Sequence, residues 1–561
     1  MQLIECVPNI SEGRDASIIK QITDVVETVN GVRLLDVDPG KATNRTVITF
    51  VGEPSAVVEA AFKLIKKASE LIDMSKHTGE HPRMGATDVC PMVPISNISM
   101  EETAAYAHSL GKRVGDELNI PVYFYENAAK SKERRNLATV RSGEYEGLKN
   151  KLKDPNWKPD CGPSKSEGVQ KTGATAISAR DFLVAYNINL NTTSTRRANA
   201  IAFDVREKGR VAREGGTLSG KIIKDADGKD LWTPGTLKSV KAIGWFIEEY
   251  GVAQISMNLT NISTTSIHEA FDEVSRNAQD RGIRVTGSEL VGLVPLNAIL
   301  SAGKHFLRKQ QRSVGVSEAE LIKIAVKSLG LDELGPFRPE ERIIEYMLSA
   351  GNEQKLVNLT LSEFADETAA ESPAPGGGSI SAYAGVLGIS LATMVANLSS
   401  HKRGWDNRWE EFSIWAEKGQ KYKNELIRLV DEDTNSFNKI MDAIRLPKGS
   451  ESEKAARQEE IIKATKYAIE IPFKVMETAY ESMKTIKAMA EIGNPNSVTD
   501  AGVGALCART AVMGAFMNVK INCKDLDDTE YVNDIISRGA AIQKMAQDIE
   551  AEVIEITNNK I

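Results

Sequence analysis

Residues 74–87 (MSKHTGEHPRMGAT) connect an expected helix to an expected strand and are long enough to be a functional loop. The loop holds two of the six histidines of the chain, one of which is His81. Pro82 follows His81 and favours extended backbone there, which restricts where the imidazole points. An imidazole titrates near neutral pH and can act as a general acid or base. Taken alone, however, a loop histidine is more often a solvated surface residue.

Neighbouring strands would bring further polar groups to this loop. Asn9 and Asp38 lie at or near the ends of two strands that a split βαβ unit places in the same region. A carboxylate from Asp38 could orient the imidazole of His81 or stabilise its charged form, as an acid/base pair requires. These neighbouring polar residues favour a catalytic role for His81.

Asp433 is a second candidate, because it lies on the apolar stripe of a long expected helix, between Val430 and Phe437. The stripe consists of Tyr422, Leu426, Val430, Phe437, Ile440 and Ile444. An unpaired carboxylate on a buried stripe is costly, and loss of solvent raises its pKa toward the range of a general base at neutral pH. The alternative is an aspartate that hydrogen-bonds to a neighbouring helix, and spacing alone favours that alternative.

A glycine run, Gly376, Gly377 and Gly378, precedes the apolar helix expected from residue 380 onward. Glycines before a helix leave backbone N–H groups open to an anion or a flat ligand. No Gly-Lys-Ser/Thr follows, so the run is not a P-loop, and a flexible linker remains the alternative. The motifs G-x-S-x-G, H-E-x-x-H and C-x-x-C are absent, which argues against serine hydrolases, zincins and zinc ribbons.

Composition narrows the class of protein. The 561 residues include 70 basic and 77 acidic side chains, and the net charge of −7 is opposite in sign to that of a nucleic-acid binder. Five scattered cysteines indicate reduced thiols, with neither a disulfide framework nor a zinc site. We see no apolar run approaching the ~20 residues of a membrane span and no signal peptide. We therefore expect a cytoplasmic protein that binds neither nucleic acid nor membrane.

The elements expected to position these residues begin with an α/β pattern. The first 95 residues have the order strand, helix, strand, strand, helix, strand, and the first strand is expected over residues 3–10 (LIECVPNI). This is the ferredoxin-like split βαβ arrangement with two helices on one sheet face. The same order recurs after residue 180, so we expect two similar subdomains, 1–180 and 181–330, facing each other across a cleft. A polar excursion at 209–236 reads as a surface hairpin without chemistry. A linker, 331–355, leads to an all-helical bundle at 356–561.

Taken together, the motifs resemble those of the formimidoyltransferase-cyclodeaminase family of histidine degradation. The resemblance rests on ECVPNISEG, LLDVDPG, NRTVITFVG, GEHPRMGATDVCP, PVYFYE and SELVGLVPL, followed by APGGGS and LVDEDTNSF, and it is collinear over nearly the whole chain. The family pattern lacks the full excursion at 209–236 and has a differently sized loop around 162–173. The bundle also resembles methenyltetrahydrofolate cyclohydrolases.

The resemblance implies two reactions. The first half would move the formimino group of N-formimino-L-glutamate to N5 of tetrahydrofolate, and the bundle would close the product to 5,10-methenyltetrahydrofolate with loss of ammonia. His81 would be the transferase acid/base, Asp38 would stabilise its imidazolium, and Asp433 would be the base of the cyclodeaminase. The implied substrate-binding residues include Lys76 and Arg83, which could hold substrate carboxylates. The resemblance also implies a folate loop from Gly162 to Gly173, with Pro163 and Ser164, and adds Asn9, Gly376, Gly377 and Gly378.

The same resemblance implies polyglutamated tetrahydrofolate as co-substrate, no metal, and a ring-like homo-oligomer, an octamer. Three alternatives stay open. The bundle could be a cyclohydrolase, although the transferase product carries the nitrogen that a deaminase releases. The protein could be a non-catalytic folate-binding scaffold, against which the presence of both His81 and Asp433 weighs. If the resemblance misleads, the chain is a cytosolic α/β transferase of unknown substrate.

Overall fold

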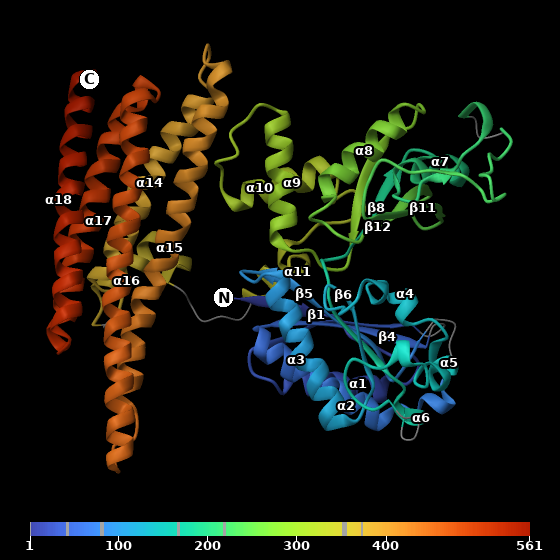
Figure 1. Ribbon diagram of the computed structural model, residues 1–561. Coiled ribbons are helices and arrows are strands. Elements are labelled where there is room, and N and C mark those ends of the chain that lie inside the picture. The colour runs from blue at the N-terminus through green and yellow to red at the C-terminus, as the bar shows by residue number, and fades with distance from the viewer. Residues whose placement is uncertain are drawn as a thin grey trace. The chain divides into compact units, whose positions relative to one another are not determined.

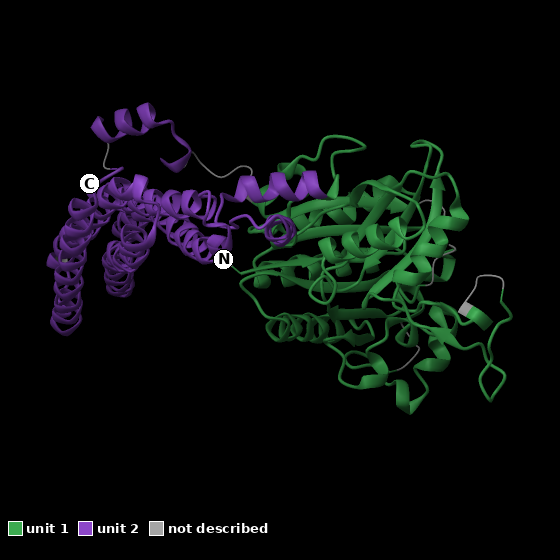
Figure 2. Ribbon diagram, turned by 90° about the horizontal axis from the view of Figure 1, so that it is seen from above, with its two compact units in different colours: residues 1–298, 329–350 green, residues 299–328, 351–561 purple. Residues whose placement is uncertain are grey.

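The computed structural model describes residues 2–40, 44–78, 83–164, 169–216, 220–349, 356–371 and 374–561. The chain forms two compact units, residues 1–298 with 329–350, and residues 299–328 with 351–561 (Figure 2). Mixed α/β layers are followed by an all-helical region, as the sequence predicted. Each unit is described separately below.

The first sheet of the first unit is mixed and has seven strands, in the order β1-β4-β2-β5-β7-β6, with β3 paired to β4. Pairs among the first five strands are antiparallel, whereas β7 runs parallel to both β5 and β6. One strand was expected over residues 3–10, but it is divided in two, and Pro8 at the break has no N–H to donate to a sheet. The strands are β1 (Leu3–Cys6), β2 (Asn9–Ile10), β3 (Val32–Gly40), β4 (Arg45–Gly52), β5 (Thr87–Ser96), β6 (Val122–Glu126) and β7 (Thr175–Ala179).

Helices cover both faces of this sheet. Alternate residues such as Ile4, Ile48 and Phe50 are fully buried against α1 (Ala16–Glu27), α2 (Pro54–Leu71) and α3 (Met100–Leu118) (Figure 1). On the other face, Val89 and Tyr123 pack with residues of three short helices, α4 (Leu137–Val140), α5 (Glu144–Lys151) and α6 (Val169–Thr172). The polar residues of the candidate transferase site stand at the edge of this second layer.

The second sheet of the unit is antiparallel, with the order β11-β12-β8-β13. Chain order alternates strand, helix, strand, strand, helix, strand, so each helix connects two strands that are separated by a third. The elements are β8 (Val184–Leu190), α7 (Thr195–Val205), β11 (Val240–Ile247), β12 (Val252–Leu259), α8 (Ile267–Gln279) and β13 (Val285–Val291). Between α7 and β11, the strands β9 (Arg210–Val211) and β10 (Trp232–Thr233) pair within the predicted excursion.

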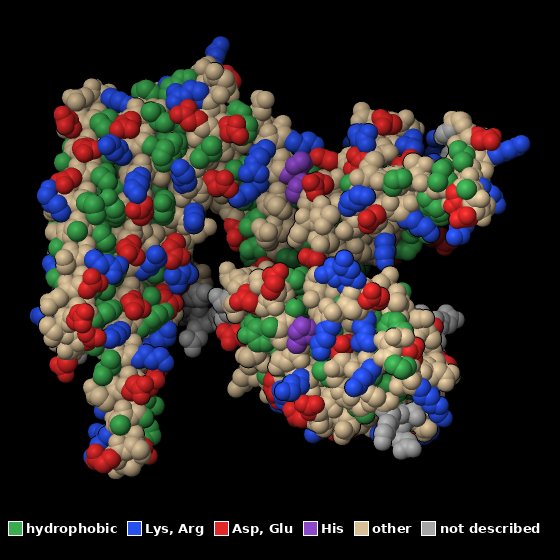
Figure 3. All heavy atoms as spheres, viewed as in Figure 1, with side chains coloured by type: hydrophobic (Ala, Val, Ile, Leu, Met, Phe, Trp, Pro, Cys, Tyr) green, Lys and Arg blue, Asp and Glu red, His purple; other side chains and the backbone are tan. Residues whose placement is uncertain are grey.

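The second unit is a bundle of long helices. Its core is built from α14 (Gly377–Ser400), α15 (Trp409–Arg445), α16 (Glu451–Ile492), α17 (Val498–Asn522) and α18 (Thr529–Lys560), with the short α13 (Leu361–Ala369) before them. Acidic and basic side chains are intermixed on its visible surface (Figure 3). The buried stripe predicted for α15 is only partly present, because Phe437 and Ile444 are 40% and 43% exposed.

The chain crosses between the two units more than once, so no single linker segment separates them. Most of α9 (Leu296–Lys309) and α10 (Glu318–Leu329) belong to the bundle unit, where the N–H of Val314 donates to Ser413 Oγ at 3.0 Å. The segment expected as a linker contains α11 (Pro339–Arg342) and α12 (Ile344–Ser349), which belong to the first unit.

Two bundle helices are apolar along their length. Residues 377–400 and 495–522 are long and apolar enough to cross a membrane by length and composition alone, so the expectation that no segment reaches that length is wrong. In the bundle 61% and 50% of their most apolar windows are buried. Helices buried inside a bundle have the same composition, because their partners surround them.

Candidate functional sites

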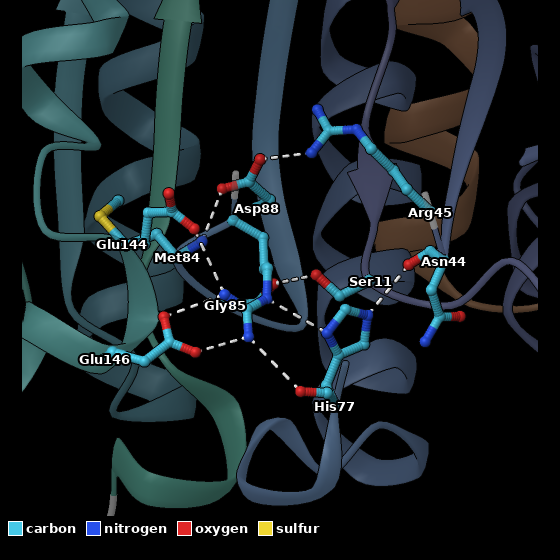
Figure 4. Close-up of polar contacts among 10 residues, drawn as sticks. Ser11, Asn44, Arg45, His77, Met84, Gly85, Asp88, Glu144 and Glu146 are labelled. Carbon is cyan, nitrogen blue, oxygen red and sulfur yellow. Dashed lines mark hydrogen bonds and ion pairs between the residues drawn. The ribbon is translucent and has the colours of Figure 1, made fainter. Parts of the chain in front are cut away.

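The loop at residues 74–87, called the transferase loop below, is described on both sides of the catalytic candidate His81. His81 lies at residues 79–82, outside the described part of the chain, as do the flanking Glu80 and Pro82. Residues 74–78 and 83–87 are described, and they carry a network of polar contacts (Figure 4). These contacts hold both ends of the transferase loop in place.

His77, the other histidine of the loop, is held at both ring nitrogens. Arg83 Nε donates to Nδ1 at 3.2 Å, so Nδ1 is the acceptor and Nε2 carries the proton that it donates to the carbonyl of Asn44 at 2.9 Å. The Asn44 side chain donates to the carbonyl of Thr78 at 2.9 Å and accepts from the N–H of Gly13 at 3.0 Å. His77 is therefore a structural residue that ties the loop to the start of β4.

Arg83, expected to hold a substrate carboxylate, is paired with carboxylates of the chain. Its side chain contacts Glu146 at 2.7 Å and Glu144 at 3.3 Å, and the residue is only 8% exposed. The hydrogen bond to Glu146 raises the pKa of the guanidinium, and the same bond holds the pKa of Glu146 below its usual range. In this arrangement Arg83 anchors the loop to α5.

Asp88, at the start of β5, is fully buried between two arginines. Arg45 and Arg141 both pair with its Oδ2, and Oδ1 accepts the N–H of Met84 at 2.8 Å. Burial lowers the pKa of Arg45, and the attraction of Asp88 opposes that shift. Two guanidinium groups share one carboxylate, so the cluster carries excess positive charge beside the loop.

The remaining strand candidates have different surroundings. Asn9 lies in this cluster, where its Oδ1 accepts from Arg45 Nε at 3.0 Å and its Nδ2 donates to the carbonyl of Val7 at 2.8 Å. Asp38 is exposed on β3, and Lys76 is exposed and pairs with Asp73 at 3.3 Å. The pairing expected between Asp38 and His81 falls outside the described residues.

The predicted folate loop meets the transferase loop through the backbone. Gly173, with a φ of +65°, forms a bridge with Gly85, and a side chain at either glycine would overlap backbone atoms of the other segment. The N–H of Ala86 donates to Thr172 O at 2.8 Å, and the N–H of Ala174 donates to Met84 O at 3.0 Å. Two segments about 90 residues apart are thus fixed side by side.

The other end of the folate loop packs against α3. Gly162, with a φ of +81°, lies against Gly115 and the carbonyl of Ile120, where a Cβ would not fit. Pro163 and Ser164 follow it and are half-buried, and residues 165–168 are outside the described ranges. The described ends of the loop are well anchored.

In the bundle, the glycine run and Asp433 come together. Gly376 caps α14, and the Cα of Gly378 lies so close to the Asp433 carboxylate that a Cβ would overlap it. Ser379 Oγ lies 3.1 Å from Asp433 Oδ2 and 2.9 Å from the carbonyl of Val430. Burial raises the pKa of Asp433, while hydrogen bonds from the side chain and backbone of Ser379 partly offset the shift. Gly377 faces the side-chain amide of Asn518 on α17.

The spacing of residues in the sequence did not identify every residue of the two candidate sites. Arg45, Ser379 and Asn518 contact the candidates Asn9, Asp433 and Gly377, yet none of the three was predicted. Asp88, Arg141 and Asn44, which complete the polar network around the transferase loop, were not predicted either. The motifs that carry the resemblance did include Arg45, Asp88 and Asn44. They indicated that these residues matter, but not which residues they contact. Among the described residues, no group of three or more His, Cys, Asp or Glu could hold a metal ion.

Comparison with known proteins covers both units. Three family models match the chain: the N-terminal subdomain of the formiminotransferase domain at residues 3–180, the formiminotransferase domain at 185–349, and formiminotransferase-cyclodeaminase at 360–540. A formimidoyltransferase-cyclodeaminase of Mus musculus is 42% identical over 94% of each chain.

Single-function proteins match each half. A glutamate formimidoyltransferase of Thermoplasma acidophilum is 44% identical over 55% of this chain and 93% of its own length. A methenyltetrahydrofolate cyclohydrolase of Methylorubrum extorquens is 31% identical over 36% of this chain and 98% of its own. The two halves of the sequence therefore each have relatives that stand alone.

Proposed function

The chain belongs to the formimidoyltransferase-cyclodeaminase family, and from that premise we propose how its residues divide the two reactions. The enzyme is bifunctional. It transfers the formimino group of N-formimino-L-glutamate to tetrahydrofolate, and it converts the resulting 5-formiminotetrahydrofolate to 5,10-methenyltetrahydrofolate and ammonia. The residue assignments that follow are our proposal.

In the transferase, His81 moves protons. N5 of tetrahydrofolate loses a proton as it attacks the amidine carbon, and the glutamate nitrogen gains one as it leaves. A group that titrates near neutrality serves both steps, because it accepts the first proton and returns it in the second. Asp38 stabilises the imidazolium, and Lys76 binds a substrate carboxylate.

The observation that carries this proposal is the backbone pairing of residues 84–86 with 172–174. It joins the exit of the His81 loop to the exit of the loop that we propose binds folate, Gly162 to Gly173 with Pro163 and Ser164. A transfer between two substrates requires both loops at one place, because reacting atoms must be held close together.

The two buried arginines beside this pairing suit the anionic substrate. Arg45 and Arg141 together have one more positive charge than Asp88 neutralises. Arg83 is already satisfied by Glu144 and Glu146, so we assign to it the positioning of the loop instead of substrate binding. Asn9 orients Arg45 through its hydrogen bond.

In the bundle, Asp433 accepts the N10 proton as N10 attacks the carbon of the protonated formimino group. It returns that proton to the formimino nitrogen, which leaves the tetrahedral intermediate as ammonia. The proposal is supported by burial, which raises the pKa of Asp433 and so strengthens it as a base. Gly376, Gly377 and Gly378 leave room for the flat pterin ring to approach the carboxylate. The cyclohydrolase alternative would release water from the same centre.

Further features of the proposal come from the resemblance. We infer polyglutamated tetrahydrofolate as the physiological co-substrate, chemistry without a metal, a cytoplasmic location and an octameric, ring-like homo-oligomer. We also assign a ferredoxin-like arrangement to the two sheet subdomains. It is supported by the order β11-β12-β8-β13, in which each helix connects strands separated by a third.

An assay with N-formimino-L-glutamate and tetrahydrofolate tests the function. The absorbance of methenyltetrahydrofolate and the release of ammonia are followed together. We expect one ammonia for each methenyl group. Formation of the methenyl product only from a formyl substrate, without ammonia, would favour the cyclohydrolase alternative.

A further inference from the structure

A pocket outside both proposed active sites is strongly basic. It has a volume of about 780 Å³ and lies between α7 and the excursion at 209–236, which runs next to that helix in Figure 1. Its charged lining residues are Arg196, Arg206, Arg210, Arg213, Arg281 and Asp204. Five arginines against one aspartate leave four positive charges, in a chain whose net charge is −7.

The excursion is fixed to the helix by hydrogen bonds, so the pocket is preformed. Arg210 donates to the carbonyl of Ala200 at 2.6 Å, and Arg206 Nε donates to the carbonyl of Gly209 at 2.9 Å. On the returning strand, the N–H of Thr236 donates to the carbonyl of Asp204 at 3.0 Å. Pairing of β9 with β10 closes the base of the excursion.

The single acid of the pocket cannot neutralise its arginines. The two carboxylate oxygens of Asp204 pair with Arg210 and Arg281, one oxygen for each. The hydrogen bonds of Arg206 and Arg213 go to backbone carbonyl groups, and Arg206 also lies 4.0 Å from the centroid of the Phe203 ring. None of these partners carries a net negative charge. Arg196 is exposed at the pocket, and no acidic partner for it is found in the described part of the chain.

Arg206 and Arg210 are also partly buried. Nε of Arg210 is buried and has no hydrogen-bond partner among the described residues. Burial lowers the pKa of Arg206. A buried donor without a protein partner can be satisfied by a water or an anion, and guanidinium groups bind phosphate and carboxylate through paired hydrogen bonds.

We propose that this pocket is a binding site for a small polyanion that carries at least two phosphate or carboxylate groups. Its volume is in the range of small-molecule sites. Two anionic groups fit the charge better than one, because four positive charges remain after Asp204 is counted. The site goes beyond the proposed function, since none of its residues takes part in either reaction.

Calorimetric titration with two probes tests the proposal and its chemistry. Pyrophosphate and citrate are titrated separately into the full-length enzyme at low ionic strength. We expect saturable binding of one probe molecule per chain for at least one of them. The probe that binds more tightly identifies phosphate or carboxylate as the preferred group.

The matched variants are Arg196→Glu and Arg197→Glu, on neighbouring positions of α7. Both side chains are exposed, but only Arg196 lines the pocket. Charge reversal at Arg196 should weaken binding at least ~10-fold, while reversal at Arg197 should change it less than ~2-fold. Unfolding temperature gives a second readout, since the probe should raise it for wild type and Arg197→Glu and much less for Arg196→Glu.

Two results would overturn the site. One is the absence of saturable binding of either probe. The other is an equal loss of affinity in both variants, which would mean that only the general charge of α7 attracts anions.

Discussion

The two candidate active sites are built in different ways. In the transferase half, the ends of the loop that contains His81 are held by contacts with Asn44, with Glu144 and Glu146 of α5, with Asp88 of β5 and with Gly173. In the bundle, one carboxylate lies between two helices, with Gly378 against it and Ser379 hydrogen-bonded to it. The first site depends on many charged partners and the second on close packing.

This difference predicts how each site fails. A loop held by several ion pairs should lose its geometry gradually as single partners are removed, because the others remain. A carboxylate held by close packing should be displaced by one added methyl group, because packed atoms cannot be compressed. The substitutions below test this contrast, beginning with the catalytic residues.

The largest effect is expected for His81→Ala. Loss of the proton-transfer group should lower the transferase rate at least ~100-fold. Cyclisation of supplied 5-formiminotetrahydrofolate should stay near normal, because the bundle has its own base. A parallel loss of both activities would instead indicate misfolding, which circular dichroism would detect.

Asp433→Asn should have a similar effect on the other half. The amide keeps the volume of the side chain and removes its basicity, so cyclodeamination should fall ~100-fold while transfer continues. The intermediate 5-formiminotetrahydrofolate should therefore accumulate in product analysis by chromatography. Near-normal ammonia release would remove Asp433 as the base.

The pH dependence of cyclodeamination by the wild-type enzyme also tests Asp433 as the base. Burial raises the pKa of Asp433, so its carboxyl is protonated at a higher pH than an exposed aspartate. The rate of cyclodeamination should fall on the acid side at a pH clearly above the ordinary value of 3.8. A rate that falls only near that value would contradict the assignment.

Gly378→Ala tests close packing. The added methyl group would overlap the Asp433 carboxylate, and displacement of a reacting group by about 1 Å can cost ~100-fold in rate. We expect a loss of ~30-fold in cyclodeamination and none in transfer. Gly385→Ala is the matched control on the same helix, because its methyl group would meet only side-chain carbons, of Leu426 at 3.2 Å and Ala511 at 3.3 Å. Equal losses in the two variants would contradict the packing argument.

Arg83→Met tests the loop anchored by ion pairs. It removes the contacts to Glu144, Glu146 and His77, and we expect a ~10-fold lower transferase rate with unchanged cyclodeamination. Arg113→Met is the control, since Arg113 also pairs with two glutamates but lies on the surface between α2 and α3. Its effect should be under ~2-fold, and a similar loss in both variants would show that Arg83 has no special role.

The smallest effect on activity is expected at Glu5, a buried carboxyl that we place in neither reaction but that should affect stability. Burial raises its pKa from 4.5 to about 7, so the folded state prefers the protonated form and loses stability as pH rises between these values. The loss amounts to about 3 kcal/mol. Glu5→Gln should be more stable than wild type at pH 8, with a much smaller difference at pH 4.5, as measured by denaturant unfolding. An equal difference at both pH values would contradict the shift.

The sequence predicted the elements better than the contacts. Helical periodicity placed Asp433 correctly beside Val430, because an α-helix repeats every 3.6 residues whatever surrounds it. It failed at Phe437 and Ile444, which are exposed. Periodicity identifies a stripe of apolar residues but not how far along the helix its partners extend.

The spacing of residues along the sequence could not predict contacts between distant segments. The approach of Gly378 to Asp433 spans 55 positions, and the pairing of Arg83 with Glu146 spans 63. Both depend on how whole elements pack, which no local pattern specifies. Pro8 is the opposite case, because its missing N–H is a local property and the interruption of the strand could have been read from it.

Mixing the two catalytic variants tests most directly that one chain carries two separate active sites. His81→Ala and Asp433→Asn are each assayed alone and then mixed in equal amounts, with N-formimino-L-glutamate and tetrahydrofolate as substrates. We predict little methenyltetrahydrofolate from either variant alone and its formation by the mixture after a lag, as intermediate released by one variant reaches the bundle of the other. Failure of the mixture to form the product, although each variant keeps its remaining partial activity, would contradict the account.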